Sequence, residues 1–158
     1  MTNEEIARRF ERLSQLMTIR GDEPFRTRAY RNAAESVREW RTPLSQVAAR
    51  GGAKGLQEIP GVGKAISGKI IELLTGGTFE AWERIIAETP ETVLEILRVD
   101  GVNMKIAGEL YTRFRVSSIA DLKSFVEGGG LEMIDGVGEK IMARIKRGIA
   151  DFGMRNAD

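Results

Sequence analysis

The stretch that decides the fold is IPGVGKAISGKI, residues Ile59 to Ile70. It places Gly61 and Gly63 on either side of a valine, after a proline and before a run of residues typical of a helix. Glycine is the default turn residue, because it adopts left-handed backbone without steric cost. A tight turn at the start of a helix also leaves backbone N–H groups free, and these suit a phosphate oxygen. The stretch therefore predicts either a packing turn between two helices or a phosphate-binding turn.

The same pattern occurs twice more, as LRVDGVNMKIAGEL from Leu97 and LEMIDGVGEKIMARI from Leu131. Each copy has an apolar residue two before its first glycine, another directly after it, and an apolar-periodic helix beyond. A simple packing turn gives no reason for this repetition, which therefore favours phosphate binding. The backbone groups expected to contact phosphate lie at Gly61, Val62, Gly63, Gly101, Val102, Asn103, Gly136, Val137 and Gly138, with the Lys140 side chain beside the third turn.

The middle copy differs from the other two, because Asn103 stands where they have Gly63 and Gly138. Asparagine tolerates left-handed backbone better than most residues, so we expect the turn itself to persist. The sequence leaves two alternatives for this copy, a turn that still admits a phosphate and one that the Asn103 side chain closes.

Helical periodicity accounts for the rest of the chain. Residues Ile6, Phe10, Leu13 and Met17 follow Asn3, a good N-cap, and predict a helix that ends near Gly21. A second apolar stripe predicts a helix over 24–40, and Thr42 followed by Pro43 predicts the cap and first residue of a third. Further helices are expected over about 64–74 and 78–87 and after Pro90. The second stripe consists of Phe25, Ala29, Ala33, Val37 and Trp40.

No segment alternates with a period of two for long enough to predict a strand. The sequence therefore predicts an all-α fold of two small helical lobes, residues 1–88 with the first turn and residues 89–158 with the second and third.

Composition excludes several functions. The chain has no cysteine and no histidine, which excludes a disulfide framework, thiol catalysis and the usual zinc ligands.

The charge balance limits the kind of nucleic-acid site that the chain can have. With 24 basic and 23 acidic residues the net charge is +1, so binding must depend on local clusters and not on a global field. One cluster on the last helix, Lys140, Arg144, Lys146 and Arg147, predicts either a duplex contact or a solubility surface. The charged start is neither a signal peptide nor a membrane span, and we expect a cytoplasmic protein without a membrane partner.

The three repeated stretches resemble helix-hairpin-helix motifs, and nearly the whole chain resembles the amino-terminal region of family X, the DNA polymerase beta-like enzymes. The most specific part is FRTRAYRNAA, residues 25–34, followed by IPGVGKAISGKI. The resemblance implies a 5′-deoxyribose-phosphate lyase domain followed by a DNA-binding fingers subdomain. The family's nucleotidyltransferase palm does not follow within this sequence, so we expect no polymerase activity from this chain alone.

Carried over residue by residue, the resemblance makes Lys69 the Schiff-base lysine that attacks C1′ of an abasic sugar. Tyr30 matches the tyrosine beside that pocket, and Arg26 falls where the family often has a phosphate-binding lysine. Ala65 replaces a second pocket lysine, for which the neighbouring Lys64 is a substitute. Gly68 replaces an acidic residue sometimes proposed to help proton transfer.

The resemblance also implies a monovalent cation, Na⁺ or K⁺, between the hairpin carbonyls and a DNA phosphate. The matching carbonyls are those of Ile59 and Val62 in the first hairpin and of Leu97, Val99 and Val102 in the second. The lyase chemistry itself is expected to need no cofactor.

The residues around Lys69 leave two interpretations open. Its place beside Ile66 and Ile70 puts it at the edge of an apolar face, where partial desolvation would enlarge the neutral fraction of the amine. A boundary lysine that keeps its ammonium in water has the same position. Arg26 and Tyr30 are four residues apart and share a helix face, which suits a 5′-phosphate.

These features together predict a monomeric, nucleoid-associated protein that binds gapped, nicked or 5′-phosphorylated DNA in base-excision or gap repair. We expect it to excise 5′-deoxyribose phosphate through Lys69. Two alternatives stay open, a helix-hairpin-helix module that binds DNA without chemistry and a helical interaction domain in which the hairpins are only turns.

Overall fold

The computed structural model describes residues 1–156, which consist of helices and connecting turns without any strand. The predicted all-α fold is confirmed. Two compact units are present: unit 1 comprises Met1–Met17 and Asp22–Glu88, and unit 2 comprises Thr18–Gly21 and the chain from Thr89 onward. The expected domains 1–88 and 89–158 stay a prediction. No helix within the described residues is long and apolar enough to cross a membrane.

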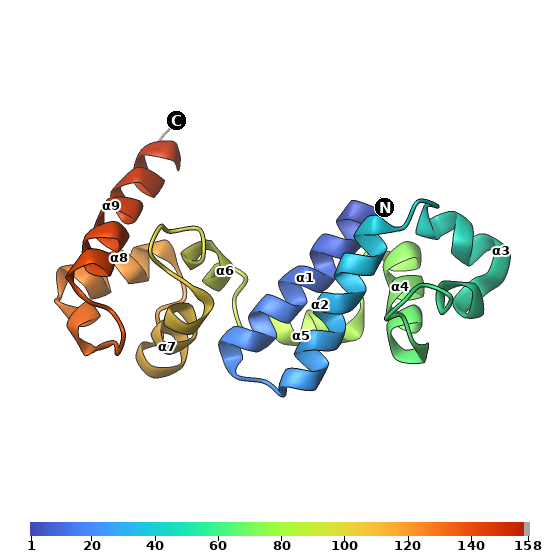
Figure 1. Cartoon of the computed structure of the whole chain (residues 1–158), viewed down its shortest axis with the longest axis horizontal. Helices are drawn as coiled ribbons and strands as arrows, with labels where there is room; N and C mark the ends of the chain where they lie inside the picture. The colour runs from blue at the N-terminus through green and yellow to red at the C-terminus, as the bar shows by residue number, and fades with distance from the viewer. Residues whose placement is uncertain (157–158) are drawn as a thin grey trace. The chain divides into compact units, whose positions relative to one another are not determined.

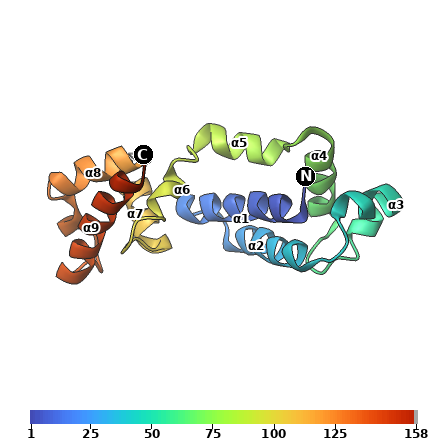
Figure 2. The same cartoon turned by 90° about the horizontal axis from the view of Figure 1, so that it is seen from above.

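Unit 1 is built around α1 (Asn3–Arg20) up to its residue 17; this part of the helix lies between α2 (Pro24–Glu39) and α5 (Glu80–Glu88) (Figures 1 and 2). The predicted α1 stripe is confirmed, since Ile6, Phe10 and Leu13 are fully buried and Met17 nearly so. Phe10 is central to the core, because its ring stacks on Tyr30 at 6.0 Å and on Phe79 at 5.6 Å between centroids.

The start of α1 differs from the prediction. Thr2, not Asn3, caps the helix: its Oγ1 accepts from the amide of Glu5 at 3.1 Å, and a Glu5 carboxylate oxygen accepts from the Thr2 amide at 3.2 Å. The Asn3 side chain instead donates to the carbonyls of Trp40 and Thr42. Its Oδ1 accepts from the amide of Leu44 at 2.8 Å.

That last bond explains how α3 (Leu44–Leu56) begins. The predicted cap at Thr42 is wrong, because Pro43 has an extended backbone (ψ 132°) and the helix starts one residue later. A distant side chain, Asn3, supplies the acceptor that no local residue provides. Gly52 then interrupts α3 with a left-handed φ of 59°, which leaves a short helical turn directly before the first hairpin.

The apolar stripe predicted for α2 is wrong at its first half. Phe25 is 77% exposed and Ala29 is exposed, because residues spaced by four drift about 40° around the helix at each step. The face that turns to the core is centred on Tyr30 and consists of Thr27, Tyr30, Ala33, Ala34 and Val37.

The remaining helix of unit 1, α4 (Lys64–Gly76), follows the first hairpin as predicted. Unit 2 contains α6 (Val93–Ile96), α7 (Met104–Phe114), α8 (Ile119–Glu127), the 3₁₀ helix η1 (Gly130–Met133) and α9 (Glu139–Asn156) (Figure 1). Its core includes Val93, Leu110, Leu122 and Ile145, all fully buried. In each unit, a short helix, a hairpin and a longer helix come together as the repeats predict.

Candidate functional site

The three repeats have one backbone geometry. Hairpin 1 is residues 59–63, hairpin 2 is 99–103 and hairpin 3 is 134–138. The first glycine of each is left-handed, with φ of 80° at Gly61, 90° at Gly101 and 85° at Gly136. The amide of the following valine donates to the carbonyl three residues back, at 3.0, 3.1 and 3.4 Å respectively. A left-handed third residue with this bond is the pattern of a type II turn.

The second motif position has a different conformation. Gly63 is extended (φ −92°, ψ −166°), and so is Asn103 (φ −103°, ψ 179°). The expectation that Asn103 would need left-handed backbone is therefore wrong: the turn persists because Gly101 supplies the left-handed residue. The backbone at position 63 does not require glycine either, because it is extended. A Cβ placed there or at Gly138 would meet nothing within 4 Å, so each missing side chain leaves open space before a helix N-terminus.

Hairpins 1 and 2 differ in how the helices that follow them are capped. No side chain caps α4 after Gly63, so its first amides keep their donors for an external acceptor. In hairpin 2 the Oδ1 of Asn103 accepts from the amide of Ile106 at 2.8 Å. One donor that would face a phosphate is thus already occupied.

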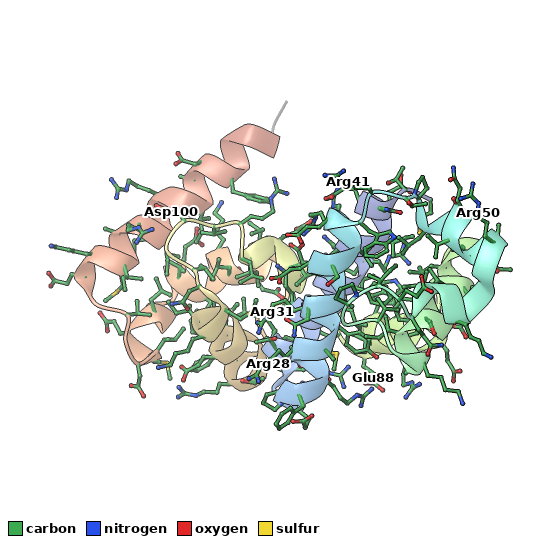
Figure 3. The ribbon with its side chains drawn as sticks, turned by 45° about the vertical axis from the view of Figure 1, so that its right-hand side comes forward. Arg28, Arg31, Arg41, Arg50, Glu88 and Asp100 are labelled. Atoms are coloured by element: carbon green, nitrogen blue, oxygen red, sulfur yellow. The ribbon has the colours of Figure 1, made fainter. Side chains whose placement is uncertain are left out.

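Hairpin 2 is also packed on α9. A Cβ at Gly101 would lie 2.9 Å from Cγ1 of Ile145, and one at Gly148 would lie 2.8 Å from the amide nitrogen of Asp100. Arg144 donates twice to Asp100, at 2.7 and 3.3 Å, and Figure 3 shows Asp100 in the loop beside α9. This bond lowers the pKa of Asp100 and raises the pKa of Arg144. The four members of the predicted basic cluster, Lys140, Arg144, Lys146 and Arg147, are all exposed, and Arg144 among them is paired with Asp100.

Lys69 lies on α4 directly behind hairpin 1. Its side chain is half-buried, and its Nζ lies 5.9 Å from the centroid of the Tyr30 ring, which is itself only 6% exposed. The structure therefore brings together two of the predicted site residues. A groove of about 570 Å³ runs along this part of α4 and the start of α5, and it is lined by Lys64, Ala65, Gly68, Lys69, Glu72, Glu80, Ala81 and Arg84.

Arg26 does not line this groove. It is exposed in the first turn of α2, one turn before Tyr30, and its backbone amide and that of Phe25 both donate to the Glu23 carboxylate, at 3.2 and 2.9 Å. The structure thus brings Lys64, Lys69 and Tyr30 into one region, whereas the place of Arg26 in the site stays a prediction. Of the other α2 arginines, Arg38 is paired with Glu4 and Glu11, and Arg28 and Arg31 project from the helix (Figure 3).

Sequence reasoning missed the acidic side of the groove and the internal role of Asp100. Glu72 could have been found, because a residue three positions after Lys69 shares its helix face. Glu80 and Arg84 could not, since only the turn between α4 and α5 brings them to the groove.

Comparison with known proteins agrees with this architecture. The family described as the helix-hairpin-helix domain matches residues 1–79, and the chain belongs to that family. Over 153 residues the chain is 26% identical to the DNA polymerase/3'-5' exonuclease PolX of Bacillus subtilis (strain 168). The match covers 97% of this chain and 26% of that protein, so the chain spans about a quarter of its relative. The resemblance to the amino-terminal region of a family X polymerase is confirmed.

Proposed function

We propose that the chain binds gapped or nicked DNA through the backbone amides of hairpins 1 and 3, without reading base sequence. The observation that carries this proposal is the shared geometry of the hairpins, two of which present an open glycine before a helix N-terminus. Such sites attract anions and position a protein on phosphates. A relative named as a DNA polymerase supports DNA as the partner. We propose that the protein acts as a monomer in cytoplasmic gap or base-excision repair.

Fluorescence anisotropy with labelled DNA tests this binding. Affinity is expected to be independent of base sequence and to fall steeply with salt, because phosphate contacts release counterions. DNA with a gap that carries a 5′-phosphate should bind more tightly than the same DNA without it. Equal affinity for the two would show that Arg26, Tyr30 and Lys64 do not form a 5′-phosphate site.

We further propose that Lys69 excises 5′-deoxyribose phosphate from such DNA. Its Nζ attacks C1′ of the ring-opened sugar and forms a Schiff base with loss of water. A base then takes the C2′ proton, and the C3′–O bond breaks to release the DNA strand. Three features support this assignment: Lys69 is a half-buried residue, its Nζ lies beside the Tyr30 ring, and the adjacent groove is lined by the small residues Ala65 and Gly68.

Borohydride trapping on pre-incised abasic DNA tests the chemistry. The wild-type chain should form a covalent adduct in the presence of EDTA. Lys69→Ala should lose most of the adduct while DNA affinity stays within a few-fold, because catalysis and binding depend on different groups. Lys64→Ala should weaken binding first. Trapping that persists in Lys69→Ala and disappears in Lys64→Ala would assign the nucleophile to Lys64.

A second candidate is a DNA-binding module without chemistry. The observation in its favour is that Ala65 and Gly68 stand where the family often has a second lysine and an acidic residue. Failure of the wild-type chain to form an adduct would support this candidate. Failure to bind DNA at low salt would instead support a helical interaction domain.

We also propose that Na⁺ or K⁺ bridges the hairpin carbonyls to a DNA phosphate. The oxygens of Ile59 and Val99 each accept one turn hydrogen bond, from Val62 and Val102, which leaves each a second lone pair for a cation. Those of Val62, Leu97 and Val102 would complete the two sets of ligands. Replacement of Na⁺ and K⁺ by tetramethylammonium at constant ionic strength should weaken DNA binding.

A further inference from the structure

The groove beside Lys69 contains two carboxylates that the proposed reaction has not used. Schiff-base chemistry at Lys69 needs a base for the C2′ proton, and Gly68 offers none. Glu72 and Glu80 are the acidic residues that line the groove. They differ in position and in their partners, and this difference decides between them.

Glu80 is the less suitable of the two. It lies in the first turn of α5 with its side chain 88% exposed, and its Oε1 is 3.9 Å from Nη2 of Arg84. A proton acceptor has to come within about 3 Å of the proton's carbon or heavy-atom partner. Exposure does not separate the two carboxylates, because Glu72 is exposed as well. What sets Glu80 apart is that it lies on α5 and not on the helix of Lys69, and that its carboxylate is beside Arg84.

Glu72 is on α4 three residues after Lys69, so both side chains project from the same helix face, about one turn apart. Within residues 1–156 its carboxylate has no hydrogen-bond or ion-pair partner, and its lone pairs are free to accept a proton. Space for a sugar lies next to the two side chains. Ala65 and Ala81 are small, and a Cβ at Gly68 would meet nothing within 4 Å.

We infer that the carboxylate of Glu72 is the catalytic base of the lyase reaction, an inference that rests on the function proposed above for Lys69. After Nζ has condensed with C1′ and water has left, Glu72 removes a proton from C2′. The C–H electron pair forms the C1′–C2′ double bond and neutralises the iminium. The enamine then expels the phosphate oxygen from C3′, forming the C2′–C3′ double bond and restoring the iminium. Water hydrolyses the iminium, which regenerates Lys69, and the Glu72 proton passes to solvent.

Glu72→Gln tests this role because it keeps the shape of the side chain and removes the base. Two readouts on pre-incised abasic DNA separate the steps. Adduct trapped at short times reports on Lys69, and single-turnover release of the sugar phosphate reports on proton removal. Glu72→Gln is expected to form at least as much early adduct as the wild type and to release the sugar about a hundredfold more slowly. Glu72→Asp should recover part of the rate.

The control for loss of one surface charge is Glu35→Gln, an exposed residue of α2 outside the groove, which should retain the wild-type rate of release. Release at the wild-type rate from Glu72→Gln, or a comparable loss in Glu80→Gln alone, would overturn the assignment of Glu72 while leaving Lys69 as nucleophile. Absence of any adduct with the wild-type chain would overturn the lyase function and this inference together. Thermal unfolding by circular dichroism checks that each variant is folded.

Discussion

Hairpins 1 and 2 have the same turn and opposite surroundings. Both have a left-handed glycine and the same turn hydrogen bond. Hairpin 1 leaves room for a Cβ beside α2, since a Cβ at Gly61 would be in ordinary contact, 3.8 Å from the nearest backbone atom, whereas one at Gly101 would overlap Ile145 of α9. Hairpin 1 leaves its helix uncapped, and hairpin 2 closes its own with Asn103.

The comparison shows that the repeated motif specifies the turn itself. The residues around it decide whether the turn packs against another helix or leaves a helix N-terminus open. The first glycine is needed in every copy because of its positive φ. The second position has extended backbone in hairpins 1 and 2, a conformation that does not require glycine, so its side chain, or the lack of one, decides whether the helix N-terminus is open. On this basis we expect hairpin 2 to serve mainly in packing α9, and we propose that hairpins 1 and 3 are the ones that bind DNA.

The largest difference between the two hairpins is expected in stability. Gly101→Ala should destabilise unit 2 by about 2–5 kcal/mol, because left-handed alanine costs about 1–2 kcal/mol and the contact with Ile145 adds about 1–3 kcal/mol of overpacking. Gly61→Ala should cost only the backbone strain, about 1–2 kcal/mol. Urea unfolding followed by circular dichroism measures both.

Gly136→Ala is the matched control, since Gly136 has φ of 85° and a Cβ there would meet nothing within 4 Å. It should resemble Gly61→Ala and not Gly101→Ala. Equal losses at all three glycines would show that the approach of α9 to hairpin 2 does not constrain position 101.

A second test gives hairpin 1 the side-chain cap that hairpin 2 has. Gly63→Asn should place an amide oxygen on the N–H of Ile66, as Asn103 does for Ile106. Stability should rise by a few tenths of a kcal/mol, while affinity for gapped DNA should fall roughly tenfold, since a charge-assisted hydrogen bond is worth about 1.5–3 kcal/mol. Anisotropy and thermal unfolding measure these opposite effects.

Gly63→Ala separates the two causes of that loss, because it adds bulk without a cap. Affinity that falls in Gly63→Asn but not in Gly63→Ala would assign the effect to the occupied amide. Unchanged affinity in both variants would reduce hairpin 1 to a packing turn.

The reverse exchange, Asn103→Gly, should have a smaller effect. It frees the amide of Ile106 and is expected to tighten DNA binding by about two- to fivefold, with a loss of stability of a few tenths of a kcal/mol. The gain is limited because the contact of hairpin 2 with α9 remains. Weaker binding in this variant would mean that the Asn103 side chain itself contacts DNA.

The sequence predicted the helices and the three turns well, because both depend on local patterns. It failed where a distant residue changes a local preference. Asn3 caps α3 in place of Thr42, and the position of α1 selects which face of α2 is buried, leaving Phe25 exposed. Among the candidate site residues, Lys69 and Lys64 follow from the resemblance to family X, whereas Glu80 and the pairing of Arg144 with Asp100 depend on tertiary packing between separate elements.

The smallest expected effect concerns the pair of Asp100 and Arg144. Hairpin 1 has no such pair, because Pro60 stands where hairpin 2 has Asp100. The hydrogen bond from Arg144 lowers the pKa of Asp100 below its ordinary value of 3.8. A lowered folded-state pKa means that the pair stabilises unit 2 above about pH 4 and that this contribution disappears as the pH falls through the lowered value. Because both side chains are at least half exposed, the effect should be small and should decrease with salt. Acid unfolding of the wild type and Asp100→Asn, followed by circular dichroism, should therefore differ above pH 4 and converge at lower pH. Curves that stay equally far apart down to pH 2 would show that Asp100 holds hairpin 2 on α9 through packing and not through its charge.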